Sequence, residues 1–407
     1  MGALSGIKVL DLTQYVAGPY CTKVLSDYGA EVIKIEKPPS GDPARGLAPF
    51  KDNQPGLESS GLFLYLNTGK KSITLNLKSV EGRKIFFRLV KDADIVVESY
   101  APRTMEALGL NYDSLRTINP SVMMTSISNF GSTGPYKNYK LTDIVMYAMG
   151  LTMYGTGMAD REPQKLALTL IQHQAGMIAA ATTIGAYLGR EMHGLSQHLD
   201  IALMETQLAS IDRTATQAIA YSYAGDFPHT RVTAENAVSI MPMGIYPCAD
   251  GYVTFVAANP LWWPRFVKMI DMPELSDDPR FQDDDFGFVY NLDYKDEMDA
   301  LVLGWTTQLT KQQVMERAQA AGMAGTSINS MEDVYKDPQF INREFFVDID
   351  HPVAGVVRYP GTPAQLSESP AEIRRAPLLG EHNKEIYCSV LGYEIEDLPL
   401  LREQMVI

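Results

Sequence analysis

A polar triplet, Gln172-His173-Gln174, stands before an alanine-rich run in the stretch LTLIQHQAGMIAAAT, residues 168–182. A carboxamide is neutral at every physiological pH and is a poor nucleophile, whereas an imidazole can act as a base or as a nucleophile. If the stretch is helical, the side chain of His173 points about 100° away from that of Gln172. Asp143, in KLTDIVMY, offers a carboxylate earlier in the chain. These residue types leave His173 and Asp143 as the candidates for covalent or acid–base chemistry.

Lysines of the first 150 residues form a second group of chemically useful side chains. The chain carries 35 Lys and Arg against 49 Asp and Glu, which gives a formal net charge of −14. This balance argues against a nucleic-acid partner, because a phosphate backbone requires a basic face. A small polyanion needs only a local cluster of cations. The alternative is that these lysines are ordinary solvated surface charges.

Apolar runs alternate with amphipathic stretches through the first third of the chain. An amphipathic helix is predicted at residues 80–93, and strands are predicted at residues 7–12, 29–37, 71–77, 94–100 and 121–128. Strand, helix and strand at this spacing predict right-handed βαβ units and a parallel sheet. The fold class is therefore expected to be α/β.

The carboxyl ends of parallel strands are the expected ligand-binding edge of such a sheet. The loops at this edge are residues 13–19, 36–45, 99–103 and 129–140. In the first loop, AGPY at residues 17–20 places a glycine and a proline at a predicted helix N-terminus, where backbone N–H groups could approach a ligand. A tight strand-to-helix turn is the simpler interpretation. No G-x-G-x-x-G follows the first strand, which argues against NAD or FAD.

A length of 407 residues favours two domains. We expect residues 1–225 to form the N-terminal part of a large domain, residues 226–325 a small α+β domain, and residues 326–407 a return to the large domain. Residues 226–240 are expected to be a loop at the domain crossing, and residues 244–259 a hairpin.

Other side chains give weaker signals. Three scattered cysteines and six histidines show neither disulfide nor metal-ligand spacing, so no metal is expected. Trp262 and Trp263 are expected to pack in a core, although they could also line an acyl pocket. No basic stretch precedes the first apolar run, and no run reaches about 20 apolar residues. We therefore expect a cytoplasmic protein with no membrane partner.

Several sequence blocks occur in a characteristic order. They are LSGIKVLDLT with AGPY, GAEVIKIEKPPSGDPAR, NTGKKSITLNLK, DIVVESY, GIYPCADGY, DDPRF and GEH. In this order and spacing they resemble the CaiB/BaiF family, the class III coenzyme A (CoA) transferases, over nearly the whole chain. The resemblance implies a Rossmann-like large domain built from both ends of the chain, a smaller middle domain, and two chains interlocked as a dimer. It also implies acyl-CoA as substrate, with no covalently bound cofactor.

The resemblance further implies which residues contact CoA. Lys37 is expected near the adenosine or its phosphates, and Lys140 at another contact. The remaining expected contacts are Val16, Ala17, Leu75, Asn76, Leu77, Lys78, Ser99, Tyr100 and Ala101. Family members usually have an arginine that binds phosphate where this chain has Ala107. Arg103, four residues earlier and on nearly the same face of a helix, is the candidate replacement.

The nucleophile of class III transferases is an aspartate four residues before the glycine that begins the small-residue helix. Counting back from Gly176 gives Gln172. In the family reaction the carboxylate attacks the donor thioester, forms a mixed anhydride and then an aspartyl-CoA thioester. An amide cannot form these intermediates, so no catalytic residue is assigned in this chain. Related 2-methylacyl-CoA racemases need a histidine where Thr142 stands and an aspartate at or beside Gln172, and both are missing.

Three hypotheses follow. The first is a non-catalytic subunit of a heteromeric CoA-transferase whose aspartate comes from a paralogous subunit. That arrangement resembles the nucleophile-lacking subunit of succinyl-CoA:(R)-benzylsuccinate CoA-transferase, which acts in anaerobic toluene breakdown. The second is a self-sufficient transferase with an unusual nucleophile. The third is a catalytically inactive CoA-binding or regulatory protein.

Overall fold

The computed structural model describes residues 1–158, 160–210, 212–225, 242–256, 262–281 and 292–407. The chain divides into two compact units. The first unit comprises Met1–Met153, Lys165–Phe227 and Arg343–Ile407, and the second comprises Tyr154–Gln164 and Pro228–Asn342. The first unit is therefore built from both ends of the chain.

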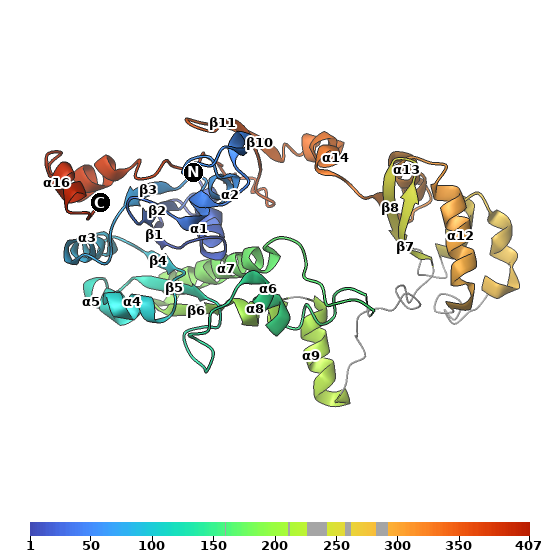
Figure 1. Cartoon of the computed structure of the whole chain (residues 1–407), viewed down its shortest axis with the longest axis horizontal. Coiled ribbons are helices and arrows are strands. Elements are labelled where there is room, and N and C mark those ends of the chain that lie inside the picture. Colours follow the sequence, from blue (N-terminus) through green and yellow to red (C-terminus); the bar gives the residue numbers. More distant parts are fainter. Residues whose placement is uncertain (159, 211, 226–241, 257–261, 282–291) are drawn as a thin grey trace. The chain divides into compact units, whose positions relative to one another are not determined.

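A six-stranded sheet forms the centre of the first unit (Figure 1). Its strands are β1 (Lys8–Leu12), β2 (Glu31–Glu36), β3 (Lys71–Thr74), β4 (Ile95–Glu98), β5 (Met123–Ser128) and β6 (His198–Ala202). They lie in the order β3-β2-β1-β4-β5-β6, and every neighbouring pair is parallel. The predicted α/β class is thus confirmed, and all five predicted strands of the first third are present.

Both faces of this sheet are covered, which explains the nearly continuous apolar character of its strands. One face buries Leu10 and Val96 against α3 (Val80–Val90), the π-helical turn Glu385–Val390 and α16 (Asp397–Glu403). The other face buries Val9 and Val97 against α1 (Ala17–Asp27) and α7 (Leu170–His193). Consecutive residues of β1 thus serve opposite cores, as a strand period of two requires.

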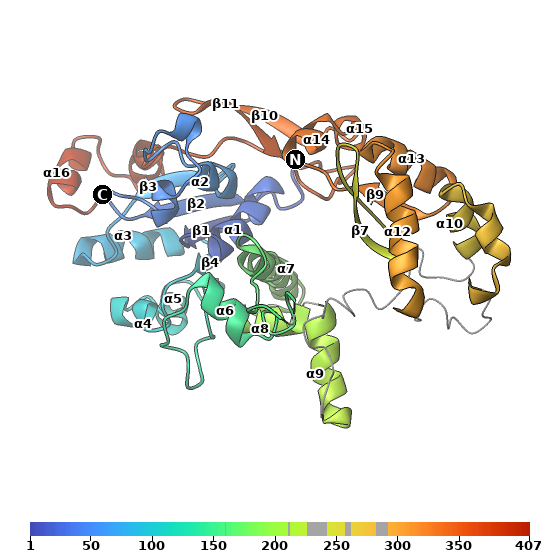
Figure 2. The same cartoon turned by 45° about the vertical axis from the view of Figure 1, so that its right-hand side comes forward.

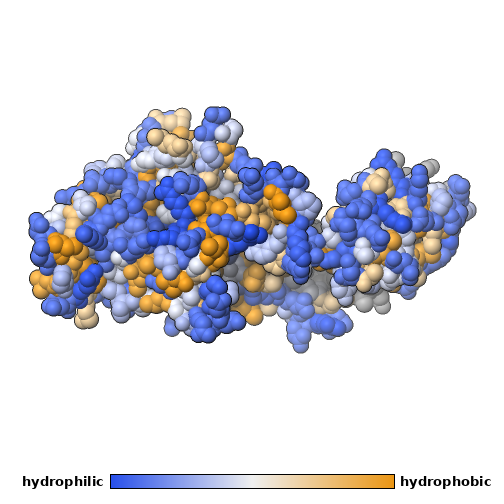
Figure 3. Space-filling view, turned by 90° about the horizontal axis from the view of Figure 1, so that it is seen from above, coloured by the Kyte–Doolittle hydropathy of each residue, from blue (hydrophilic) through white to orange (hydrophobic). Residues whose placement is uncertain are grey.

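The remaining elements of the first unit surround this sheet (Figures 1 and 2). Its other helices are α2 (Gly61–Leu66), α4 (Arg103–Leu108), α5 (Tyr112–Ile118), α6 (Asp143–Met149), α8 (Leu203–Ser210) and α9 (Asp212–Ala224). An antiparallel hairpin, β10 (Phe346–His351) with β11 (Gly355–Pro360), begins the C-terminal return. The space-filling view shows hydrophobic residues scattered among hydrophilic ones over this unit (Figure 3).

The second unit contains a three-stranded antiparallel sheet. Its strands are β7 (Met243–Cys248), β8 (Gly251–Val256) and β9 (Ala324–Ser327). Its helices include α10 (Trp263–Met269), α12 (Lys295–Thr306), α13 (Lys311–Ala320), α14 (Met331–Lys336) and α15 (Pro338–Asn342). Trp263 is buried against Phe266 and Phe281 in the core of this unit, so it packs rather than lines a pocket.

The unit boundaries differ from those expected from the sequence. The return to the first unit is at Arg343, not at residue 326, because β9 pairs with β8 and stays in the second unit. Residues 154–164 also belong to the second unit. The expected loop at 226–240 lies outside the described residues. Among the helices that the structure describes, none is long and apolar enough to cross a membrane.

Candidate functional site

A cavity of about 230 Å³ lies where strands β2, β3 and β4 end. It is lined by Gln14, Ile35, Lys37, Leu75, Asn76, Leu77, Lys78, Tyr100, Thr104 and Leu108. Lys37, Tyr100 and the run Leu75–Lys78, all expected CoA contacts, therefore meet in one place. Most of the wall is apolar, and its only charged side chains are the two lysines. Such a slot suits a flat, uncharged ring with phosphate groups at its rim.

A second cavity, of about 400 Å³, shares Tyr100 with the first and has the opposite character. Its lining contains no lysine or arginine but four carboxylates, those of Glu98, Glu106, Asp113 and Asp200. Burial raises the pKa of Glu98 to about 7, and the nearby Asp200 carboxylate adds to the rise. These carboxylates would repel phosphate. A polyphosphate ligand thus favours the cavity that contains Lys37 and Lys78.

The loop after β1 reaches the cavity that contains Lys37 and Lys78, and it also approaches helix α7. Gln14 lines the cavity, and its backbone N–H donates to Ser99 Oγ at 2.9 Å. Val16 and Ala17 are buried where α1 begins. A Cβ at Gly176 would lie 2.4 Å from the carbonyl oxygen of Ala17, so only glycine permits this approach of α7 to α1. The close packing places the N-terminus of α7 beside the loop.

Six expected CoA contacts are not part of the cavity lining: Val16, Ala17 and Ser99, which lie in or beside the loop after β1, and Ala101, Arg103 and Lys140. Ala101 and Arg103 are exposed at the start of α4, and Lys140 is exposed in the segment before α6. On α4 it is Thr104 and Leu108 that line the cavity. The side chain of Arg103 therefore does not occupy the cavity in place of the arginine that Ala107 replaces.

Gln172 lies in the first turn of α7, half-buried. Its Nε2 donates to Asp143 Oδ1 at 3.2 Å, and Lys165 Nζ lies 2.8 Å from Asp143 Oδ2. Lys165 also donates to the carbonyl oxygens of Leu166 and Leu168, at 2.9 and 2.8 Å. The Asp143 carboxylate is thus within hydrogen-bonding distance of Gln172, but it is already paired with the ammonium group of Lys165 and the amide of Gln172.

His173 is directed to other partners. Its Nδ1 lies 3.0 Å from the carbonyl oxygen of Thr169, and its ring meets the ring of Tyr20 edge to face at 4.9 Å. The imidazole therefore packs against α1 and does not share the contacts of Gln172. This agrees with the different directions expected for neighbouring residues of a helix.

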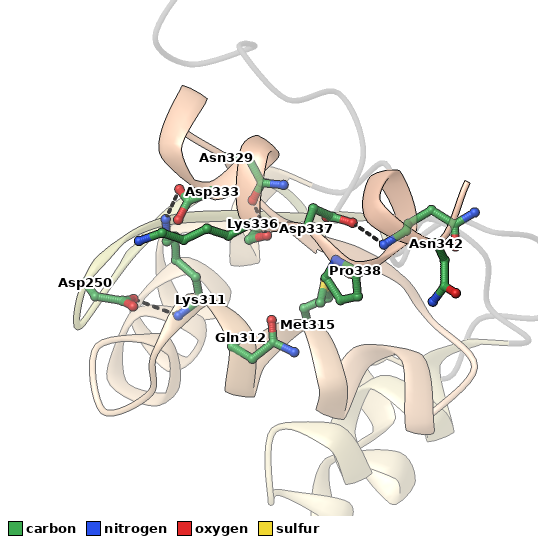
Figure 4. Close-up of a pocket in the computed structure, with 12 residues that line it drawn as sticks. Asp250, Lys311, Gln312, Met315, Asn329, Asp333, Lys336, Asp337, Pro338 and Asn342 are labelled. Carbon is green, nitrogen blue, oxygen red and sulfur yellow. Dashed lines mark hydrogen bonds and ion pairs between the residues drawn. The ribbon is translucent and has the colours of Figure 1, made fainter. Parts of the chain in front are cut away.

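The second unit has its own cavity, of about 580 Å³ (Figure 4). Its charged groups are already paired with one another. Lys311 Nζ lies 2.6 Å from Asp333 Oδ2, the backbone N–H of Lys311 donates to Asp250 Oδ1 at 2.7 Å, and Lys336 is paired with Glu332. This cavity therefore offers a polyanion no uncompensated cluster of cations. In the described parts of the chain no group of three or more His, Cys, Asp or Glu side chains could hold a metal ion.

Several residues of the site were not singled out from the sequence. Gln14, Thr104 and Leu108 belong to loops or helices next to predicted contacts, so proximity along the chain was the only available signal. Lys165 approaches Asp143 from a segment without regular structure, which no sequence pattern indicates.

Comparison with known proteins identifies the family. The model of CoA-transferase family III matches residues 4–383. The chain is 33% identical to a formyl-CoA:oxalate CoA-transferase of Streptomyces avermitilis, over 100% of this chain and 99% of that protein. It is 32% identical to a succinyl-CoA–D-citramalate CoA-transferase of Chloroflexus aurantiacus, over 99% and 98%. A crystal structure of a CaiB/BaiF family protein from Brucella suis superposes with a TM-score of 0.83 at 30% identity, covering 96% of this chain and 99% of that one.

The family match extends over most of the chain, and the relatives' names describe transfer of CoA between acids. Their substrates are CoA thioesters, which accords with the phosphate-compatible cavity at Lys37 and Lys78. The chain belongs to CoA-transferase family III, the class III CaiB/BaiF transferases.

Proposed function

We propose that this chain is a subunit of a heteromeric class III CoA-transferase, with the catalytic aspartate supplied by a paralogous subunit. The observation that carries the proposal is Gln172, an amide at the family's nucleophile position. The surrounding framework is retained, because Gly176 still packs against Ala17 and α7 still begins beside the loop after β1. The chain therefore keeps the architecture of the site without its reactive atom.

The missing step is covalent. The partner's aspartate oxygen would attack the thioester carbon and expel CoA thiolate, which leaves a mixed anhydride. The thiolate then attacks the aspartyl carbonyl of this anhydride and expels the donor carboxylate, so that CoA is bound to the aspartate as a thioester. The acceptor carboxylate then attacks this thioester and receives CoA through a second anhydride. Each step needs an anionic oxygen that can both attack and leave. The neutral carboxamide of Gln172 supplies neither property.

The cavity at Lys37 and Lys78 supports a role in binding acyl-CoA. We propose that the nucleotide end of CoA occupies it, with Asn76 and Tyr100 on its walls. Val16, Ala17 and Ser99 would then lie along the path toward α7. Ala101, Arg103 and Lys140 would contact CoA only at its exposed side, since they do not line the cavity.

Exposed apolar side chains support a second chain as partner. Three helices that each contact α8 carry them: Ile144, Val145 and Met149 on α6, Leu170, Leu188 and Met192 on α7, and Ile219, Tyr221 and Tyr223 on α9. An apolar surface of this kind is typical of a protein–protein interface. We propose that a related subunit covers it, interlocked with this chain as the family implies, in the cytoplasm.

The proposed donor is succinyl-CoA. Relatives named for succinyl-CoA or succinate include the Chloroflexus aurantiacus protein and a succinate–glutarate CoA-transferase of Agrobacterium fabrum, 30% identical over 95% of both chains. For the acceptor we propose benzylsuccinate, on the resemblance to the benzylsuccinate transferase subunit.

One observation favours a second candidate, a self-sufficient transferase that uses Asp143 as nucleophile. Its Oδ1 lies 3.2 Å from Gln172 Nε2, so a carboxylate is close to the usual reacting position. The ion pair with Lys165 argues against it, because the carboxylate would have to leave that ammonium group in order to attack.

Expression of the chain alone, and together with a paralogue that has aspartate at this position, tests the proposal. Transfer from succinyl-CoA to benzylsuccinate is expected only with both chains, and should survive Gln172→Ala in this chain. Activity of the lone chain that disappears in Asp143→Asn but not in Gln172→Ala would instead establish the second candidate. CoA binding without transfer in any combination would leave a CoA-binding protein.

A further inference from the structure

Two buried lysines lie close to the loop after β1. Lys34, on β2, and Lys70, just before β3, are 0% and 3% exposed. Lys70 Nζ lies 3.0 Å from Asp11 Oδ2, and Lys34 Nζ lies 2.8 Å from Asp42 Oδ2 and 4.0 Å from Asp11 Oδ2. All four charged groups are buried, and the central carboxylate of Asp11 links the two ammonium groups.

One end of this network holds backbone of the loop after β1, and the other holds backbone of the first turn of α1, which follows that loop. Lys34 Nζ donates to the carbonyl oxygen of Thr13 at 2.9 Å, and Lys70 Nζ donates to that of Pro19 at 3.0 Å. Between them, Asp42 Oδ1 accepts from the backbone N–H of Tyr15 at 3.1 Å. The loop and the first turn of α1 are therefore held at three points by side chains from elsewhere in the sequence.

The conformation held in this way is not one that the loop favours by itself. Tyr15 has φ = 66°, in the left-handed region, which is costly for a residue with a Cβ. The Tyr15–Asp42 hydrogen bond lies at this position. The network therefore compensates a locally unfavourable backbone.

Two residues, Gln14 in the loop and Ala17 at its end, connect the buried lysines to ligand binding. Gln14 lines the cavity with Lys37 and Lys78, and the carbonyl oxygen of Ala17 sets the approach of α7 at Gly176. The loop thus joins the cavity to the helix that bears position 172. A shift of the loop would alter both.

We propose that Lys34 and Lys70 are positioning residues for acyl-CoA: they fix the loop after β1 and the first turn of α1 in their binding conformation without touching the ligand. This inference rests on the proposed CoA site. Buried ion pairs contribute little net stability, because desolvation offsets their attraction. Retaining two lysines here is better explained by the single conformation that they impose on the loop.

A structural control lies on the neighbouring helix. Lys23 and Asp27 of α1 form an equally buried ion pair, at 4% exposure each, but neither contacts the loop or the cavity. Methionine replaces lysine with an apolar side chain of similar length. Lys23→Met, Lys34→Met and Lys70→Met therefore remove comparable buried charges, and only the last two release the loop.

Isothermal titration of the full chain with acetyl-CoA, with the melting temperature measured in parallel, tests the proposal. All three variants should melt at lower temperature. Lys34→Met and Lys70→Met should weaken acetyl-CoA binding by about tenfold, as expected if the binding conformation of the loop is populated in only about a tenth of the molecules. Lys23→Met should stay within about twofold of wild type. If either loop variant does not fold, Thr22→Val removes the hydroxyl that bridges Lys70 and Asp11, and a weakening of about threefold is expected.

A pH profile adds a measurement that general destabilisation would not alter. Burial lowers the pKa of Lys70 to about 8, with the Lys34 charge acting in the same direction and the Asp11 and Asp42 carboxylates opposing it. Two further titratable groups interact with it: the carboxyl of Asp27, whose pKa is raised by burial, and the buried thiol of Cys21, whose pKa is raised so that it stays neutral. Wild-type affinity for acetyl-CoA should therefore fall as pH rises from 7 to 9. The same fall should occur in Lys23→Met and be absent in Lys70→Met.

Two results would overturn the inference while leaving the CoA site intact: wild-type affinity in the folded loop variants, or an equal loss in Lys23→Met. Absence of acetyl-CoA binding by the wild-type chain would overturn both the inference and the site on which it rests.

Discussion

Replacing Gln172 by aspartate is expected to restore the nucleophile that the family reaction requires. In the wild-type chain Gln172 Nε2 donates to Asp143 Oδ1 at 3.2 Å. In Gln172→Asp two carboxylates would face each other at about 4 Å, where like charges repel by about 4 kcal/mol at an effective dielectric constant of 20. Lys165, 2.8 Å from Asp143, offsets part of this repulsion. We expect the free energy of unfolding to fall by about 1–2 kcal/mol, within the range that most folded proteins tolerate.

Gln172→Asp should gain reactivity toward acyl-CoA despite this loss of stability. Without a carboxylate at position 172 no acyl-enzyme can form at that residue, so even a slow nucleophile raises the rate of covalent modification there from zero. The assay is incubation of purified Gln172→Asp with succinyl-CoA, followed by trapping with borohydride or hydroxylamine and peptide mass analysis. A modification confined to the peptide that contains residue 172 is expected.

Two control variants separate the new nucleophile from other effects. Gln172→Asn has the size of aspartate without its charge and should acquire no label. Gln174→Asp places a carboxylate two residues further along α7, on a different face of the helix, and should also remain unlabelled. If folded Gln172→Asp binds acetyl-CoA but is not labelled, the pocket around position 172 is no longer a transferase site, and the reasoning from the retained framework is refuted.

Three further predictions concern the same unit. Gly176→Ala should lower the free energy of unfolding, measured by urea denaturation, by about 2 kcal/mol, because the new Cβ meets the carbonyl oxygen of Ala17. The control, Gly185→Ala on the same helix, meets no atom within 4 Å and should be neutral or stabilising, so equal effects of the two variants would contradict the close packing of α7 against α1. The double variant Lys37→Ala, Lys78→Ala should weaken acetyl-CoA binding by at least about tenfold and reduce the dependence of this affinity on salt concentration. Lys91→Ala, which removes an exposed lysine outside the cavity, should change neither the affinity nor its salt dependence. An unchanged salt dependence in the double variant would mean that the phosphates bind elsewhere. The pKa of Glu98 is raised from 4.5 to about 7, so its ionisation in the folded protein costs stability as pH rises from about 5 to 8. The free energy of unfolding of Glu98→Gln should therefore exceed that of the wild type by up to about 3 kcal/mol at pH 8 and equal it at pH 4. If the stability of both proteins depends on pH in the same way, the ionisation of Glu98 does not limit stability.

The sequence by itself determined the local elements and the family. Period-two alternation and apolar runs are local properties, so the order of residues alone was enough to locate β1, β2, β3, β4 and β5. The order of short blocks along the chain identified the CaiB/BaiF resemblance. The amide at position 172 was also evident, because a spacing of four residues from Gly176 is a one-dimensional fact.

Only the tertiary structure decided which of these residues meet. Lys34 stands between Ile33 and Ile35 in its strand, and the sequence does not show whether its ammonium group is solvated or paired. In the structure both faces of the sheet are covered, and its partner Asp42 lies in a later loop. Arg103 matched the expected helix face, yet α4 directs Thr104 and Leu108 into the cavity instead. The boundary at Arg343 depended on the pairing of β9 with β8. Each of these outcomes depends on contacts between segments far apart in the chain, which local residue patterns do not specify.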